Sequence, residues 1–283
     1  MDSFAAEGYI QARKLAKSHY ENFPVVSVFI KKTLRNDVAI VYWFARTADD
    51  IADEGNNSPD EKVNLLNKFE SDFIRTISGN PKNPLEAALL HTINTHSLST
   101  KDFLNLLSAF KQDITVNRYE SMDLLLDYCS RSANPVGRII LDLHGIKVEN
   151  LKLLSDKICT ALQLTNFWQD VSVDFLKNRI YVPKLELLRF GVFSDDISST
   201  IDTATFKECI KYLCFYTNNM FKEGQKLVRQ LPQPLRYEIA WTVNGGKNIL
   251  EKIRKIDYNV FRERVTLSKL DYLGLAVLSL LNE

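Results

Sequence analysis

Four side chains between positions 42 and 53 have the types and spacing to hold a charged ligand. They are Tyr42, Arg46, Asp49 and Asp53. In a helix, where each residue turns by about 100°, these four lie along one narrow stripe, with Asp50 to one side. The aromatic neighbours Trp43 and Phe44 favour an inward-facing surface over a solvated one. We therefore predict that this stripe of acid, base and phenol faces a cavity.

A second acidic run lies between positions 166 and 174. Asn166, Asp170 and Asp174 recur at i, i+4 and i+8, which makes them a polar strip on an otherwise apolar helix. Like charges one turn apart repel by roughly 0.2–0.5 kcal/mol per pair in a simple helix. The arrangement therefore indicates a bound cation.

The ligand types of both runs suit a hard divalent cation. Carboxylate and amide oxygens, without Cys or His at a useful spacing, favour Mg²⁺ over Zn²⁺, with Mn²⁺ as an alternative. Mg²⁺ is usually held by one or two carboxylates plus phosphate oxygens, which indicates a diphosphate substrate. The predicted metal ligands are Asp49, Asp53, Asn166, Asp170 and Asp174. Taken alone, each run is more often a solvated acidic patch, but two such runs weaken that alternative.

Long helices must position these runs, and the rest of the sequence has the same character. Only 10 Gly and 8 Pro interrupt the chain, and apolar residues recur every three to four positions. We predict helices over residues 36–53, 60–78, 100–117, 122–143, 150–175, 203–230 and 235–258. Breaks are expected at Pro24, at Pro81 to Pro84 and at Pro183. Without a polar linker or a repeat, the expected fold is one all-α domain over residues 1–283.

Composition excludes several classes of function. The net charge is +1 with scattered Lys and Arg, which argues against a nucleic-acid partner. Four cysteines without a CxxC pair, and an N-terminus without an apolar signal-peptide core, predict a reducing, cytoplasmic location. The apolar tail over residues 270–281 is too short to cross a bilayer. We expect the segment 267–281 to make reversible contact with a membrane surface.

The two motifs resemble those of the squalene/phytoene synthase family. That family carries Tyr-x3-Arg-x2-Asp-x3-Asp on one helix and Asn-x3-Asp-x3-Asp ahead of Arg-x-Tyr-x-Pro on another, and both patterns are complete here. The resemblance implies an isoprenoid synthase helical bundle in which the acidic faces oppose each other across a central cavity and hold Mg²⁺ and diphosphate. It assigns catalytic roles to Tyr42, Arg46, Asp49, Asp53, Asn166, Asp170 and Asp174, and substrate binding to Arg46, Gln163, Arg179 and Tyr181.

Within that family, several segments resemble the hydroxysqualene synthase branch. They are residues 21–25, 44–50, 132–137, 164–170 and 241–246. The resemblance implies Mg²⁺-dependent loss of diphosphate from presqualene diphosphate, rearrangement of the cation and capture by water to give hydroxysqualene. No NADPH is expected, because the chain lacks a glycine-rich dinucleotide fingerprint. Gln169 stands where prenyl-joining siblings commonly have Arg, which argues against those siblings.

Aromatic walls would stabilise a carbocation without capturing it. The candidates are Phe23, Tyr42, Tyr128, Phe167 and Trp168, of which Phe23, Tyr128 and Phe167 are assigned to substrate binding. For each aromatic side chain taken singly, ordinary core packing is the more common role.

Two alternatives to this function remain open. One is a head-to-head prenyltransferase that makes presqualene diphosphate, phytoene or dehydrosqualene from two prenyl diphosphates. The other is a non-catalytic binding or assembly protein of the same fold, because fold does not fix function. The complete acidic motifs disfavour the second alternative. The oligomeric state does not follow from the sequence.

Overall fold

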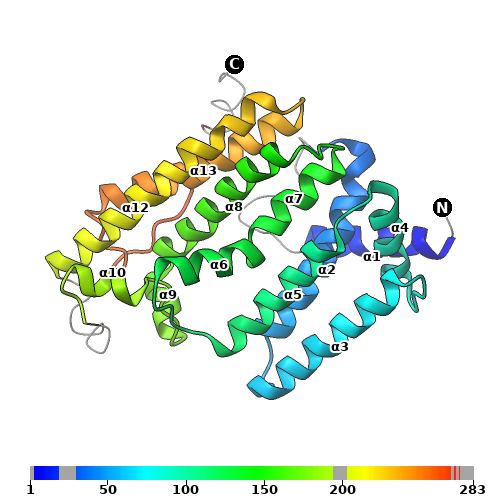
Figure 1. Ribbon diagram of the computed structural model, residues 1–283, viewed down its shortest axis with the longest axis horizontal. Coiled ribbons are helices and arrows are strands. Elements are labelled where there is room, and N and C mark those ends of the chain that lie inside the picture. Colours follow the sequence, from blue (N-terminus) through cyan, green and yellow to red (C-terminus); the bar gives the residue numbers. More distant parts are fainter. Residues whose placement is uncertain (1–2, 19–29, 194–202, 269–270, 272–273, 275–283) are drawn as a thin grey trace. The chain divides into compact units, whose positions relative to one another are not determined.

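The computed structural model describes residues 3–18, 30–193, 203–268, 271 and 274 (Figure 1). All named elements in this part of the chain are helices, and its one β-type pairing is an isolated parallel bridge between Arg118 and Ile180. The all-α prediction is therefore confirmed. The elements are α1 (Ser3–Ser18), η1 (Lys32–Leu34), α2 (Arg35–Asp53), α3 (Pro59–Ile77), α4 (Pro84–His96), α5 (Thr100–Thr115), α6 (Met122–Ser132), α7 (Asn134–Leu143), α8 (Glu149–Gln169), α9 (Val171–Leu176), α10 (Lys184–Arg189), α12 (Ala204–Gly224), η3 (Gln225–Gln230) and α13 (Leu235–Lys255).

The predicted helices differ from the observed ones mainly in their continuity. The helix predicted over residues 122–143 is two helices, α6 and α7, which separate at Ala133, two residues before Pro135. Pro135 lacks the N–H that a continuous helix needs there. The helix predicted over residues 150–175 is also two helices, α8 and α9, and the one over 203–230 changes from α12 to the 3-10 helix η3. Helices α1, α4 and α10 were not predicted, and the expected break at Pro24 lies outside the described residues.

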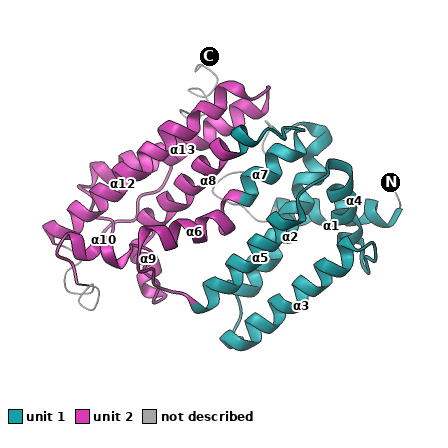
Figure 2. Ribbon diagram, viewed as in Figure 1, with its two compact units in different colours: residues 1–115, 135–152 teal, residues 116–134, 153–283 magenta. Residues whose placement is uncertain are grey.

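The chain divides into two compact units, drawn in teal and magenta in Figure 2. Unit 1 contains residues 1–115 and 135–152, and unit 2 contains residues 116–134 and 153–283. The single domain over residues 1–283 stays a prediction.

Unit 1 is built around α2, which packs against α1, α3, α4 and α5. Phe44 on α2 is 1% exposed, and its ring centroid lies 5.0–5.2 Å from those of Phe69, Phe73 and Phe103. Burying such an aromatic side chain stabilises the fold by about 1.5–3 kcal/mol. Because Phe44 points into this core, the rotation of α2 is fixed, and with it the side on which the acidic run lies.

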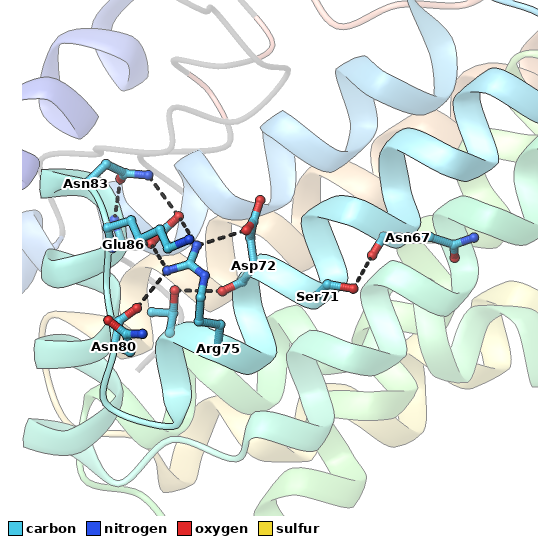
Figure 3. A network of polar contacts seen from close by, with 9 residues as sticks. Asn67, Ser71, Asp72, Arg75, Asn80, Asn83 and Glu86 are labelled. Atoms are coloured by element: carbon cyan, nitrogen blue, oxygen red, sulfur yellow. Dashed lines mark hydrogen bonds and ion pairs between the residues drawn. The ribbon is translucent and has the colours of Figure 1, made fainter.

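A polar network joins α3 to α4 in unit 1 (Figure 3). The guanidinium of Arg75 donates to both carboxylate oxygens of Glu86 at 3.0 Å, and also to Asp72 at 2.9 Å. Asn83 caps α4 by accepting from the backbone N–H of Glu86 at 2.9 Å. The hydrogen bond to Glu86 raises the pKa of Arg75. This network fixes the corner between the two helices, because each partner is positioned by more than one contact.

Unit 2 contains α12, α13 and the part of α8 from Leu153 onward, and these helices approach each other closely. A Cβ atom at Gly246 of α13 would lie 2.5 Å from Phe221 Cζ on α12 and 3.0 Å from Leu162 Cδ2 on α8. Glycine at position 246 therefore allows the three helices to pack this closely. Trp168 on α8 is fully buried and donates its indole N–H to Thr217 Oγ1 at 2.8 Å. These contacts fix the rotation of α8, which carries Asn166 of the second acidic run.

Candidate functional site

The first acidic run occupies the last turns of α2 in unit 1. Arg46 lies within 3.4 Å of Asp49, 2.6 Å of Asp50 and 2.8 Å of Glu54. The last turn of α2 contains no basic residue, although carboxylates at a helix C-terminus are disfavoured by the helix dipole. Two cations offset this acidic helix end: Arg46, one turn earlier on the same helix, and Lys62 of α3, which donates to Ala52 C=O at 2.9 Å.

The other residues predicted on α2 separate into two groups. Tyr42, Asp49 and Asp50 are partly exposed and Asp53 is exposed, as expected of side chains available to a ligand. Phe44 belongs to the core, and Trp43 packs edge-on against Phe69 at a centroid distance of 6.2 Å. These two aromatic side chains therefore stabilise unit 1 and do not mark a surface shared with the acids.

The second acidic run spans the junction of α8 and α9 in unit 2. Asp170 lies between the two helices, so the prediction of one continuous helix is wrong at this point. The spacing nevertheless survives, because Asp170 N–H donates to Asn166 C=O at 2.9 Å and Asp174 N–H donates to Asp170 C=O at 2.8 Å. Asn166 is exposed, and Asp170 and Asp174 are partly exposed. The three oxygen-bearing side chains thus follow one another at one-turn intervals, as predicted.

Arg264 is a residue of this site that the sequence analysis missed. Its Nε donates to Asp170 Oδ1 at 2.6 Å and its Nη2 donates to Asp170 Oδ2 at 3.2 Å. The hydrogen bond to Asp170 is the main reason that the pKa of Arg264 is raised, and the charge of Asp174 acts in the same direction. Arg264 follows α13 in a non-helical segment, where no periodic pattern marks it.

Gln169, which stands where we expect Arg in prenyl-joining siblings, makes a hydrogen bond to a distant part of the chain. Its side chain is buried, and Nε2 donates to the backbone C=O of Val265 at 2.7 Å. Phe261 adds an edge-on contact with Phe175 of α9 at a centroid distance of 5.4 Å. Gln169 therefore helps to hold the segment that brings Arg264 to Asp170.

Three predicted substrate-binding aromatics meet in unit 2. The rings of Phe167 and Tyr181 stack at 3.8 Å with an interplanar angle of 8°. Tyr128 lies 6.2 Å from Phe167 and 6.4 Å from Tyr181 between centroids. Tyr119, which was not predicted, completes the cluster at 5.6 Å from Tyr128. Trp168 meets this cluster edge-on at Phe167, with 6.5 Å between centroids, while its indole N–H is directed to Thr217.

The basic-aromatic sequence after α9 is brought back to the second run. Arg179 N–H donates to Asp174 C=O at 2.8 Å, and Ile180 N–H donates to Asn117 C=O at 2.9 Å. Asp174, Arg179 and Tyr181 line one small recess, together with Phe167 and other apolar side chains. Asp174, Arg179 and Tyr181 of the predicted set therefore border the same small, almost wholly apolar recess.

Two more predicted residues complete the account. Gln163 is partly exposed on α8, one turn before Phe167. Phe23 lies outside the described residues, as does most of the segment 267–281 for which membrane contact is expected. Among the helices that the structure describes, none is both long and apolar enough to cross a membrane.

The donor set of the two runs fits a hard cation, although neither run forms a finished carboxylate cluster. Asn166, Asp170 and Asp174 offer amide and carboxylate oxygens, the ligands that Mg²⁺ prefers. Within the described residues, no group of three or more His, Cys, Asp or Glu side chains is arranged to hold a metal ion. A site that relies on one or two carboxylates plus substrate phosphate oxygens does not need such a group.

Comparison with known proteins establishes the family to which the chain belongs. The sequence profile of the squalene/phytoene synthase family matches residues 16–271. The chain therefore belongs to this family, and it is an enzyme of isoprenoid biosynthesis with the isoprenoid synthase helical fold, as the two motifs predict.

Individual members of this family are similar to the chain over most of its length. A hydroxysqualene synthase from Sinorhizobium fredii is 34% identical over 274 residues, covering 96% of this chain and 91% of the relative. A hydroxysqualene synthase from Zymomonas mobilis is 34% identical over 261 residues, covering 90% of this chain and 86% of the relative. The crystal structure of squalene synthase HpnC from Alicyclobacillus acidocaldarius superposes with a TM-score of 0.86 at 35% identity, over 92% of this chain and 97% of that one. The chain is thus similar to these proteins over nearly its whole length.

Proposed function

We propose that this enzyme converts presqualene diphosphate to hydroxysqualene in a Mg²⁺-dependent reaction. The observation that carries the proposal is the ladder of Asn166, Asp170 and Asp174, whose backbone hydrogen bonds hold three oxygen donors at one-turn spacing. The similarity to two hydroxysqualene synthases over at least 90% of this chain supports the particular substrate and product.

The acidic side chains would hold the leaving group through the cation. Asp49 and Asp53 of α2 and Asn166, Asp170 and Asp174 of α8 and α9 are the proposed ligands. Bound Mg²⁺ would supply neutralisation of the charge that develops on the diphosphate as the carbon–oxygen bond breaks. Arg46, Arg179 and Tyr181 would contribute hydrogen bonds to the diphosphate oxygens.

The aromatic cluster would face the hydrocarbon part of the reaction. Tyr128, Phe167 and Tyr181 present ring faces, which attract a carbocation electrostatically without bonding to it. After rearrangement, a water oxygen forms the new carbon–oxygen bond and loses a proton to the solvent or to the released diphosphate. The products are hydroxysqualene and diphosphate, and no reductant is consumed, so NADPH is not required.

The test is a product analysis of the purified protein. One reaction contains presqualene diphosphate and Mg²⁺ in H₂¹⁸O, a second contains farnesyl diphosphate and Mg²⁺, and a third repeats the first with EDTA. Mass spectrometry should detect ¹⁸O-labelled hydroxysqualene in the first reaction alone. A condensation product in the second would assign the protein to the prenyl-joining siblings, and inertness in all three would favour the non-catalytic alternative.

A further inference from the structure

Both carboxylate oxygens of Asp170 are engaged by one guanidinium. Arg264 donates through Nε and Nη2 at 2.6 and 3.2 Å, which is the fork geometry of a strong charge-assisted pair. Asp170 is also the central residue of the proposed metal ligands of unit 2. A cation that takes Asp170 as a ligand must therefore share its oxygens with Arg264 or displace the guanidinium.

Arg264 is held in place by the segment around it, residues 260–268 with Asp271, which we call the strap. Val260 and Val265 are 0% and 7% exposed, so the strap is anchored by apolar contacts on both sides of Arg264. Gln169 adds its hydrogen bond to Val265, and Lys252 of α13 pairs with Asp271 at 2.8 Å. The guanidinium can therefore shift by its side-chain torsions while its backbone stays beside Asp170.

We propose that Arg264 is a removable counter-ion of the metal site: the guanidinium and the metal ion compete for Asp170, and the diphosphate of the substrate relieves the competition. This inference rests on the proposed function. A guanidinium and a divalent cation on the same carboxylate repel each other at a separation of a few ångströms. Diphosphate carries enough negative charge to accommodate both cations, so it should tighten metal binding, and by reciprocity the metal should tighten diphosphate binding.

This arrangement would couple the filling of the metal site to the presence of substrate. Without diphosphate, the guanidinium of Arg264 holds both carboxylate oxygens of Asp170 and so weakens metal binding to this carboxylate. With diphosphate, the metal takes Asp170 and the guanidinium keeps a negatively charged partner. Gln169 would act as a positioning residue, because its buried side chain donates to the strap backbone at Val265.

The test measures the affinity of the full chain for Mn²⁺, read as the loss of the electron paramagnetic resonance signal of free Mn²⁺. Arg264→Met should bind Mn²⁺ about tenfold more tightly than the wild type without pyrophosphate, a typical size for such a coupling. With saturating pyrophosphate, and free Mn²⁺ corrected for its pyrophosphate complex, this advantage should disappear. Equal Mn²⁺ affinities of variant and wild type without pyrophosphate would overturn the proposal.

Two further variants keep the result interpretable. Arg254→Met removes one positive charge from a pair with Glu251 elsewhere in unit 2, and it should leave Mn²⁺ affinity unchanged. An equal gain in Arg254→Met would mean that net charge alone explains the effect, and would overturn the proposal. Arg264→Lys keeps the charge without the fork and should give an intermediate affinity; it carries the test if circular dichroism shows that Arg264→Met does not fold.

The role of Gln169 has its own readout. Gln169→Leu should strengthen Mn²⁺ binding in the same direction as Arg264→Met, but less, because the strap loses one anchor and Arg264 stays. The added gain should be absent in the double variant with Arg264→Met, since a positioning residue acts only through the residue it positions. A full extra gain there would overturn this role.

The outcomes separate this inference from the proposed function. If Mn²⁺ does not bind the wild type with or without pyrophosphate, the metal site itself is wrong and both proposals fail. If Mn²⁺ binds and hydroxysqualene is formed, but Arg264→Met has the wild-type affinity in both conditions, only the counter-ion role fails.

Discussion

The two acidic motifs are neutralised in different ways. In unit 1, Arg46 lies on the same helix as its partners Asp49 and Asp50. In unit 2, Asp170 is paired with Arg264, which follows it by 94 positions. Arg46 is brought beside its partners by the formation of α2 alone. Arg264 reaches Asp170 only when the strap packs beside the end of α8.

This difference has a consequence for how each site responds to a ligand. Arg46 has three carboxylates within 3.4 Å, so the loss of one contact leaves it two others. Arg264 donates two hydrogen bonds to one carboxylate, that of Asp170. The loss of one carboxylate contact should therefore displace the guanidinium of Arg264 more than that of Arg46. Substitutions at the second motif should accordingly have larger effects than the equivalent substitutions at the first.

The largest expected effect is that of Asp170→Asn on turnover. This variant removes a metal ligand and the charged partner of Arg264 at once, and should lower turnover by a factor on the order of 10²–10³. Asp49→Asn should also abolish most turnover, but it leaves Arg46 with Asp50 and Glu54. Mg²⁺-dependent release of diphosphate from presqualene diphosphate measures both, and circular dichroism should show intact helices because core packing is untouched.

Asp127→Asn is the matched control for Asp170→Asn. Asp127 is an exposed carboxylate on α6 that pairs with Arg131 at 2.7 Å, outside both motifs. Its substitution should leave turnover at the wild-type level. Unchanged turnover in Asp170→Asn would rule out the metal assignment.

A smaller effect is expected on stability when Arg46 is removed. Arg46→Met deprives the acidic end of α2 of one of its two cations and should lower the free energy of unfolding by about 1 kcal/mol at low ionic strength. The loss should shrink in about 1 M salt, where charges are screened beyond roughly 3 Å. Chemical denaturation at both salt concentrations measures it, with Arg13→Met on the exposed face of α1 as the control. A loss that is independent of salt would point to packing instead of charge.

The first motif could be predicted in detail because its own ion pairs are local. The expected helix over residues 36–53 is observed as α2, Arg35–Asp53. Arg46 reaches Asp49 and Asp50 at i+3 and i+4, spacings that a helix always brings together. The hydrogen bond from Lys62 of α3 to Ala52 C=O, at 2.9 Å, is a contact at this helix end that the pattern of α2 alone does not predict.

The second motif was predictable in its residues but not in its surroundings. Nothing in the sequence between positions 164 and 175 forbids a continuous helix, yet the chain changes direction at Asp170. The contacts of Arg264 and of Gln169 at this junction come from about 95 positions away. Pattern reasoning within a window of one helix has no access to such contacts. The positions of Tyr119 and Trp168 were likewise decided by tertiary packing.

The smallest predicted effect concerns Asp271, which holds the C-terminal end of the strap through its pair with Lys252. Hydrogen bonds from Lys252 and Ser268 lower the pKa of Asp271 to about 2 from its ordinary 3.8. A carboxylate with a depressed pKa in the folded state adds stability above its unfolded pKa, and this stability is lost as the pH falls through the folded value. Asp271→Asn should therefore be less stable than the wild type at pH 6, by under about 1 kcal/mol because the pair is partly screened by solvent. The difference should shrink as the pH falls from about 4 toward 2.

Urea denaturation between pH 6 and pH 3 measures this difference, with Asp257→Asn as the matched control. Asp257 also pairs with a lysine, Lys207 at 3.1 Å, but its side chain is 82% exposed, so its substitution should change the free energy of unfolding less. Because Asp271 anchors the strap beyond Arg264, Asp271→Asn should also strengthen Mn²⁺ binding at pH 7, by less than Arg264→Met does. A stability gap that is the same at pH 6 and pH 3 would show that Asp271 acts through packing. In that case packing, and not charge, would hold the strap at position 271. The electrostatic difference between the two motifs would then be limited to the pair between Arg264 and Asp170.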